Sequence, residues 1–147
     1  MSNPAHILVV EARFYDEIAD ELIAGARAEL DGAGVSYEIL AVPGAFEIPA
    51  AIRMAIESGR FDGYVALGCV IRGETSHYDY VCGESARGLM ELVTRYGIAF
   101  GYGILTTENR EQAVTRANRG QKNKGADAAR ACLAMIAHRC ALVTGVT

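Results

Sequence analysis

Four short apolar runs, bounded by glycine, proline or polar residues, predict buried β-strands. They cover residues 6–10, 35–42, 64–69 and 98–105. Runs of this length that are rich in β-branched and aromatic residues are typical of strands rather than helices.

Between the strands, apolar residues recur every three or four positions, the spacing of one face of an α-helix. The stripes are Ile18, Leu22, Ala26 and Leu30; Ile48, Ile52 and Ile56; Val81, Leu89, Leu92, Val93 and Tyr96; and Ala126, Ala129, Leu133, Ile136 and Cys140. We expect Asp16 to cap the first helix, and the segment 107–109 indicates the start of a short helix near residues 112–118. The last stripe is rich in alanine, which permits close packing against a neighbouring element.

Strands that alternate with helices predict an α/β fold, in which a parallel four-stranded sheet is covered on both faces as a three-layer αβα sandwich. Gly101 and Gly103 interrupt the last strand and indicate that another element approaches its backbone closely. A polar joint at residues 119–125 precedes the last helix. Because the chain has no linker, repeat or low-complexity tract, we expect a single domain over residues 1–147.

The composition narrows the class of protein. The 147 residues are 51% hydrophobic and 22% charged, which is a globular composition, and the net charge of −4 argues against nucleic acid or an anionic membrane as a partner. The chain has neither an apolar run of about 20 residues nor a secretory leader, so we expect a cytoplasmic protein. Its four cysteines lack metal-type spacing, and we expect them to be buried and reduced.

The stretch 63–82 combines a predicted strand, a polar loop and the start of a helix. In an α/β sheet ligands bind beyond the carboxyl ends of the strands, and the free N–H groups of a helix start attract anions. His77 lies in this loop, and histidine suits proton transfer near neutral pH. The loop is therefore the first place to look for a site.

Each further candidate has a structural alternative. Glu74 and Thr75 either present N–H groups to a phosphate or simply cap the helix, and a lone histidine such as His77 is more often structural than catalytic. Arg116 is a phosphate ligand or a solvated charge. Phe14 and Phe46 are core residues or the walls of a site for a planar ring.

Several other classes of protein are disfavoured by missing motifs. The first predicted strand is not followed by GxGxxG, the chain has no P-loop, and no acidic pair ends the first strand. These absences argue against dinucleotide binding, nucleotide hydrolysis and a phosphorylation receiver. The residues themselves support a small α/β domain with an anion-tolerant loop and one histidine.

The loop GCVIRGETSHYDYVC resembles the signature of the lumazine synthase family. Four other segments match that family in order, namely ARFYDEI at 12–18, VPGAFEIP at 42–49, GILTTENREQA at 103–113 and NKGADAA at 123–129. The resemblance covers essentially the whole chain and implies a flavodoxin-like sheet with strand order 2-1-3-4. Family members condense 5-amino-6-(D-ribitylamino)uracil with 3,4-dihydroxy-2-butanone 4-phosphate to 6,7-dimethyl-8-ribityllumazine, without a cofactor or metal.

The resemblance also implies roles for residues that bind the pyrimidine substrate. Phe14 would stack on the pyrimidine ring. The ribityl side would be lined by Ala45, Phe46 and Glu47, and the pyrimidine edge would be held by Cys69, Val70 and Ile71.

A second set of roles concerns the phosphate and proton transfer. Glu74 and Thr75 would bind phosphate through their N–H groups, with Arg116 as the cationic partner. His77 would move protons, Tyr102 would come from a neighbouring subunit, and Lys124 matches a lysine near the family's site.

The family's sites lie at subunit interfaces, so the resemblance implies a homo-oligomer. Shell-forming members carry a glycine-rich joint before the last helix, whereas residues 118–123 here read NRGQKN, and we expect a pentamer, alone or paired. A carrier or sensor that binds flavin with the same fold is the competing class, but it would have no need of a histidine and an anion loop. A structural shell with vestigial activity is disfavoured by the altered joint.

Overall fold

The computed structural model describes residues 4–145; residues 1–3 and 146–147, the ends of the predicted single domain, lie outside the described part. The elements follow one another as β1 (His6–Ala12), α1 (Asp16–Ala33), β2 (Ser36–Val42), η1 (Ala45–Glu47), α2 (Ile48–Ser58), β3 (Gly63–Ile71), α3 (His77–Tyr96), β4 (Ala99–Thr107), α4 (Arg110–Ala117) and α5 (Lys124–Thr144). All strand pairs are parallel, and the order in the sheet is β2-β1-β3-β4. The predicted α/β class and strand order are confirmed.

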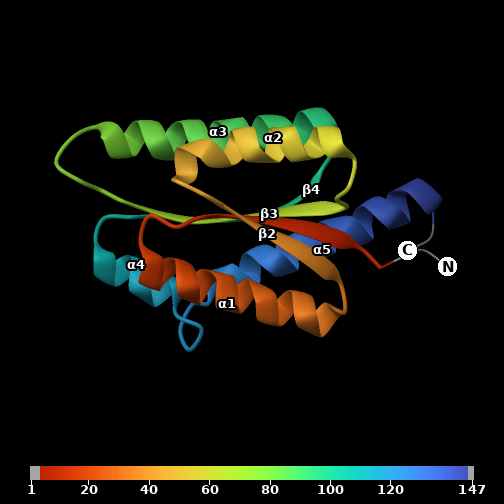
Figure 1. Cartoon of the computed structure of the whole chain (residues 1–147), viewed down its shortest axis with the longest axis horizontal. Helices are drawn as coiled ribbons and strands as arrows, with labels where there is room; N and C mark the ends of the chain where they lie inside the picture. The colour runs from red at the N-terminus through yellow and green to blue at the C-terminus, as the bar shows by residue number, and fades with distance from the viewer. Residues whose placement is uncertain (1–3, 146–147) are drawn as a thin grey trace.

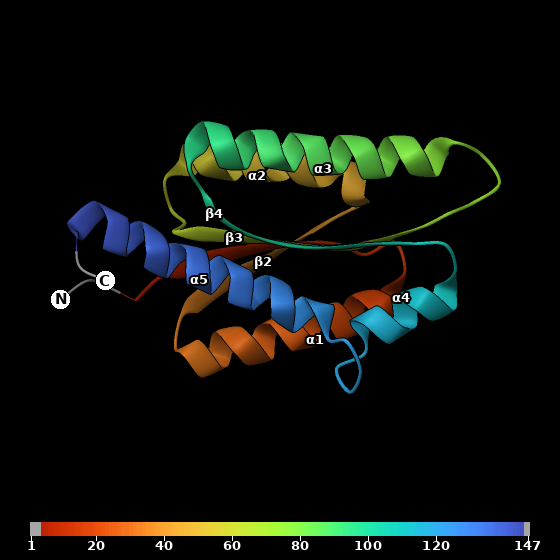
Figure 2. The same ribbon diagram turned by 180° about the vertical axis from the view of Figure 1, so that it is seen from behind.

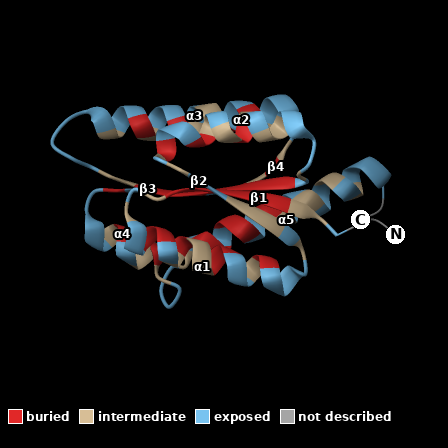
Figure 3. Cartoon of the chain, in the orientation of Figure 1, coloured by how far each residue is buried: buried red, intermediate tan, exposed pale blue. Residues whose placement is uncertain are grey.

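The sheet is the middle layer of three. Helices α2 and α3 cover one face, and α1, α4 and α5 cover the other, as the two opposite views in Figures 1 and 2 show. Alternate residues of β1 belong to two separate hydrophobic cores, one on each face of the sheet. Ile7 and Val9 pack with α1 and α5, while Leu8 and Val10 pack with α2 and α3. β1 and β3 are the most deeply buried strands (Figure 3), which explains their almost uninterrupted apolar sequences, whereas the edge strand β2 has no fully buried residue.

Glycines allow α5 to pack directly on the sheet and on α1. A Cβ atom at Gly101 would overlap the carbonyl oxygen of Ala128, and one at Gly125 would overlap that of Leu22. At Gly103 an added Cβ would crowd the Ala128 side chain. The close approach predicted at the two β4 glycines is therefore confirmed, and the neighbour is the alanine-rich first half of α5.

The helix starts correct one expectation and confirm another. Tyr15, not Asp16, occupies the N-cap position of α1, and no side chain caps that helix. Asp16 is instead the first helical residue, where its charge still favours the positive end of the helix dipole. The segment before α4 behaves as predicted, because the Asn109 side chain accepts a hydrogen bond from the Gln112 N–H at 2.9 Å.

The cysteine expectation holds only in part. Cys69 and Cys132 are buried, Cys82 is half-buried and Cys140 is exposed, and all four are free. Cys140 lies in the second half of α5, and Figure 2 shows the C-terminal end of this helix extending past the sheet. Helical spacing of apolar residues alone could not show where the underlying sheet ends. Within residues 4–145, none of the helices has the length and apolar character needed to cross a membrane.

Candidate functional site

A cavity of about 550 Å³ opens at the carboxyl ends of β1, β2 and β3. Four separate segments build it: the β1–α1 turn, the β2–η1 turn with η1, the end of β3, and the β3–α3 loop with the start of α3. Its lining residues are Phe14, Tyr15, Pro43, Gly44, Ala45, Phe46, Glu47, Cys69, Val70, Ile71, Gly73, Thr75, His77, Tyr78 and Val81. The cavity lies where ligands bind in open parallel sheets.

Most of the site residues predicted from the sequence meet in this cavity. Those that line it are Phe14, Ala45, Phe46, Glu47, Cys69, Val70, Ile71, Thr75 and His77. Three predicted residues, Glu74, Tyr102 and Arg116, are not among the lining residues of the single chain. The same holds for Lys124, which begins α5 and pairs with Asp127 at 3.3 Å.

The two phenylalanines are walls of the cavity and not core residues. Phe14 is 72% exposed and Phe46 is 56% exposed. Phe14 contacts Tyr15 edge to face, with ring centroids 5.0 Å apart, and Tyr15 packs in turn against the core beneath α1. Tyr15 thus supports an aromatic ring whose face is open to a planar ligand.

An ion-pair cluster holds the turn that presents Phe14. Glu11 is buried at the end of β1, and its carboxylate accepts a hydrogen bond from Arg13 Nη1 at 2.8 Å. Arg13 also bonds to Asp20 and contacts Asp16, both on α1. Asp20 first, and then Glu11, raise the pKa of Arg13 further above its ordinary value. The guanidinium therefore ties the end of β1 to the first turns of α1.

The end of β3 contributes an apolar floor. Burial raises the pKa of the Cys69 thiol to about 11. The thiol is therefore protonated near neutral pH and is a poor nucleophile, because the thiolate is the reactive form. Packing and backbone groups are what Cys69, Val70 and Ile71 offer to a ligand.

His77 is the first residue of the 20-residue helix α3 and is exposed at the cavity edge. Its backbone N–H donates to Thr75 Oγ1 at 3.3 Å, but Ser76 occupies the N-cap position of α3 and no side chain caps that helix. Within residues 4–145, no side chain is hydrogen-bonded to the His77 ring. The imidazole is therefore available to a ligand, and the positive end of the α3 dipole lies beside it.

The three predicted residues outside the cavity occupy other elements. Arg116 lies on α4, in the layer opposite α3, where its Nη1 donates to Gln112 O at 3.1 Å. Tyr102 lies on the edge strand β4 and is 43% exposed, with burial of its hydroxyl raising its pKa. Glu74 is exposed between two lining residues of the β3–α3 loop.

Comparison with known proteins decides the family. The model of the 6,7-dimethyl-8-ribityllumazine synthase family matches residues 4–139. The chain belongs to this family.

Individual relatives match over nearly their whole length. The 6,7-dimethyl-8-ribityllumazine synthase of Sphingopyxis alaskensis is 59% identical over 90% of this chain and 94% of its own. That of Erythrobacter litoralis is 58% identical with the same coverage of both chains. The 6,7-dimethyl-8-ribityllumazine synthase 1 of Rhizobium meliloti is 56% identical over 91% of each chain.

Sequence reasoning missed six cavity residues of this family member: Tyr15, Pro43, Gly44, Gly73, Tyr78 and Val81. All lie within four residues of a predicted one, so their position in the same turns was the available signal. Tyr78 and Val81 lie one and four positions after His77, on the first turns of α3, and Val81 was interpreted as part of the apolar stripe of that helix.

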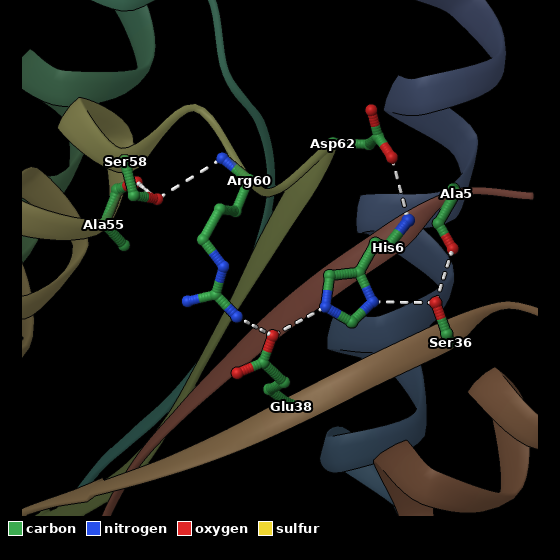
Figure 4. Close-up of polar contacts among 8 residues, drawn as sticks. All are labelled: Ala5, His6, Ser36, Glu38, Ala55, Ser58, Arg60 and Asp62. Atoms are coloured by element: carbon green, nitrogen blue, oxygen red, sulfur yellow. Dashed lines mark hydrogen bonds and ion pairs between the residues drawn. The ribbon is translucent and has the colours of Figure 1, made fainter. Parts of the chain in front are cut away.

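A second histidine, His6, lies in a cluster of polar side chains at the opposite end of the sheet (Figure 4). His6 Nδ1 lies 2.7 Å from Ser36 Oγ, and His6 Nε2 lies 2.7 Å from Glu38 Oε2, which Arg60 also contacts. The His6 ring stacks on Phe61 with centroids 5.3 Å apart. Both ring nitrogens are engaged, so this histidine clamps β1 to β2, whereas His77 is free to act on a ligand. The described part of the chain contains no cluster of three or more histidine, cysteine, aspartate or glutamate side chains suited to a metal.

Proposed function

We propose that this cavity is the active site in which 5-amino-6-(D-ribitylamino)uracil and 3,4-dihydroxy-2-butanone 4-phosphate condense to 6,7-dimethyl-8-ribityllumazine, with release of phosphate and water. One observation carries the assignment of the site: nine residues assigned to substrate binding or proton transfer by family resemblance come from four distant segments and line a single cavity. The reaction is the step of riboflavin biosynthesis that gives the family its name.

The aromatic side of the cavity fits the pyrimidine substrate. The exposed ring of Phe14 stacks on the pyrimidine, and Phe46 with Ala45 flanks the ribityl chain. Glu47 lines the same side and accepts hydrogen bonds from the ribityl hydroxyls. The backbone groups of residues 69–71 hold the edge of the ring.

The β3–α3 loop fits the phosphate and the proton transfers. Glu74 and Thr75 offer backbone N–H groups at the start of α3, and the guanidinium of Arg116 stabilises the charge of the leaving phosphate. Imine formation, phosphate elimination and ring closure each move protons, and His77 serves as both acid and base. Holding both substrates in one cavity supplies further rate.

The proposal includes a homo-oligomer based on a pentamer, with active sites between subunits. It is supported by Tyr102, which is exposed on the edge strand β4 and does not line the cavity of its own chain. A neighbouring copy would bring this ring to the site. A cytoplasmic location is also proposed, and the four free thiols fit a reducing compartment.

The test mixes the purified protein with both substrates and follows lumazine formation by absorbance and fluorescence, beside the slow uncatalysed reaction. We expect clear acceleration. His77→Ala is expected to slow turnover modestly, since water and buffer reach this exposed position and replace part of the proton transfer. Arg116→Ala is expected chiefly to raise KM for the phosphate substrate.

Two results would contradict the proposal. An unchanged KM in Arg116→Ala would remove the phosphate role of that residue. No acceleration by the unsubstituted protein, together with retained binding of riboflavin, would place it among flavin-binding proteins.

A further inference from the structure

Arg72 connects the β3–α3 loop to the segment that follows β4. It is the first residue after β3, and its backbone N–H donates to Thr107 O at 2.9 Å. Its Nε donates to Glu108 Oε2 at 2.5 Å, and its Nη1 donates to Asp79 Oδ1 at 3.3 Å. The guanidinium also covers the ring of Tyr78, 4.3 Å from its centroid. One side chain thus contacts the first turn of α3 and the start of the β4–α4 connection.

The Arg72–Glu108 pair is connected to α4 by further hydrogen bonds. The backbone N–H of Glu108 donates to Gln112 Oε1 at 2.8 Å, and the backbone oxygen of Gln112 accepts from Arg116 Nη1 at 3.1 Å. Glu108 also raises the pKa of the Arg72 guanidinium above its ordinary value. A continuous series of contacts therefore joins the start of α3 to the helix that carries Arg116.

The position of Arg72 matters because of what it flanks. The cavity is lined by four residues that follow Arg72, namely Gly73, Thr75, His77 and Tyr78. Arg72 itself does not line the cavity, but it lies at the start of the loop and contacts the helix at its end. The loop itself is exposed from residue 72 to residue 77, so core packing does not determine its shape. A planar guanidinium that bonds two carboxylates and stacks on a ring restrains such a loop in a way that lysine would not.

We propose that the Arg72–Glu108 ion pair is a positioning pair that holds the β3–α3 loop in its phosphate-binding geometry. The inference rests on the proposed function, because it assigns the support of the loop that binds the phosphate of the second substrate. Both side chains are about half exposed, 41% and 57%, and such pairs add little to folding stability. Their loss therefore acts on the site and leaves folding largely intact.

The first experiment measures KM and kcat for each substrate in Arg72→Gln, Glu108→Gln and the double variant. A misplaced binding group costs roughly ten- to a hundredfold, and we expect a rise of about tenfold in KM for the phosphate substrate with the pyrimidine KM nearly unchanged. The double variant is expected to be no worse than Arg72→Gln alone, because Arg72→Gln already removes the interaction with Glu108. Arg72→Lys is expected to restore only part of the effect.

Arg130→Gln is the matched control. Arg130 joins α5 to α1 through Glu29 at 2.6 Å and also pairs with Asp127 at 3.0 Å, so it too is an exposed arginine with two carboxylates. Its two carboxylate partners lie on α1 and α5 rather than on the loop, and Arg130→Gln is expected to leave both KM values unchanged. An unchanged phosphate KM in the Arg72 and Glu108 variants, or equal rises for both substrates with a lowered Tm, would overturn the positioning role.

The second experiment does not require turnover and so separates failure of this inference from failure of the proposed reaction. Inorganic phosphate is titrated into the whole protein while the ring resonances of His77, assigned with His77→Gln, are followed by NMR. We expect these resonances to shift, with about tenfold weaker apparent affinity in Arg72→Gln. No shift in the unsubstituted protein, or equal affinity in the variant, would overturn the inference.

Discussion

Replacing Phe14 by alanine separates binding from folding in this protein. The ring is 72% exposed, so its removal is expected to lower the free energy of unfolding by about 1 kcal/mol or less. A stacked pyrimidine would cover one ring face and remove about 50 Å² of apolar surface from water, which is worth about 1.3 kcal/mol. Favourable offset stacking adds about 0.5–1.5 kcal/mol. Together these predict about twenty- to a hundredfold weaker binding.

The assay is a titration of 6,7-dimethyl-8-ribityllumazine followed by its fluorescence. The chain has no tryptophan, so tryptophan emission does not interfere. Phe14→Tyr keeps the ring face and is expected to bind nearly as the unsubstituted protein does. Leu142→Ala, an equally exposed apolar side chain on α5, serves as the control for surface substitution. A Kd for Phe14→Ala within twofold of the original would refute the stacking role.

Three further predictions concern the fold. Gly101→Ala is expected to lower the free energy of unfolding by about 3 kcal/mol, because its Cβ meets the fixed carbonyl of Ala128. Gly83→Ala, on an open face of α3, is expected to raise the free energy of unfolding, and urea unfolding measures both changes. Hydrogen bonds from His6 and Arg60 lower the pKa of Glu38. The stability that Glu38 contributes is therefore complete above the ordinary pKa of 4.5 and is lost as the pH falls through the lowered pKa. Glu38→Gln is expected to weaken the dependence of Tm on pH below roughly pH 5. Asn109→Ala is expected to cost about 1 kcal/mol by removing the cap of α4, and an unchanged urea midpoint would contradict the capping role.

Local patterns predicted the elements well because secondary structure depends on near neighbours. The strand and helix segments all form, and the turn at Asn109 behaves as its sequence indicates. Errors arose where burial depends on a distant partner. Cys140 belonged to the predicted apolar stripe of the last helix and yet is exposed, because the sheet ends before it reaches this part of α5.

The site was predictable to a different extent. His77 and its loop were visible in the sequence alone as a polar break between a strand and a helix. From the residues alone, Phe14 and Phe46 were either core residues or walls of a site, since nothing local distinguishes the two, and Cys69 acquired a role only through family resemblance. The exposure of the two phenylalanines and the cavity they share with Cys69 became visible only with the tertiary structure, in which the strand order brings the ends of β1, β2 and β3 together.

By itself, the sequence determined the α/β class, the position of the anion-type loop and, through five matching segments, the family. Only the tertiary structure decided that nine predicted residues share one cavity, that Tyr102 and Arg116 stand outside it in a single chain, and that Arg72 pairs with Glu108. The physical reason is that periodicity and turn chemistry act over a few residues. A cavity or an ion pair between residues 36 positions apart exists only after parallel strands bring separate loops to one edge of the sheet.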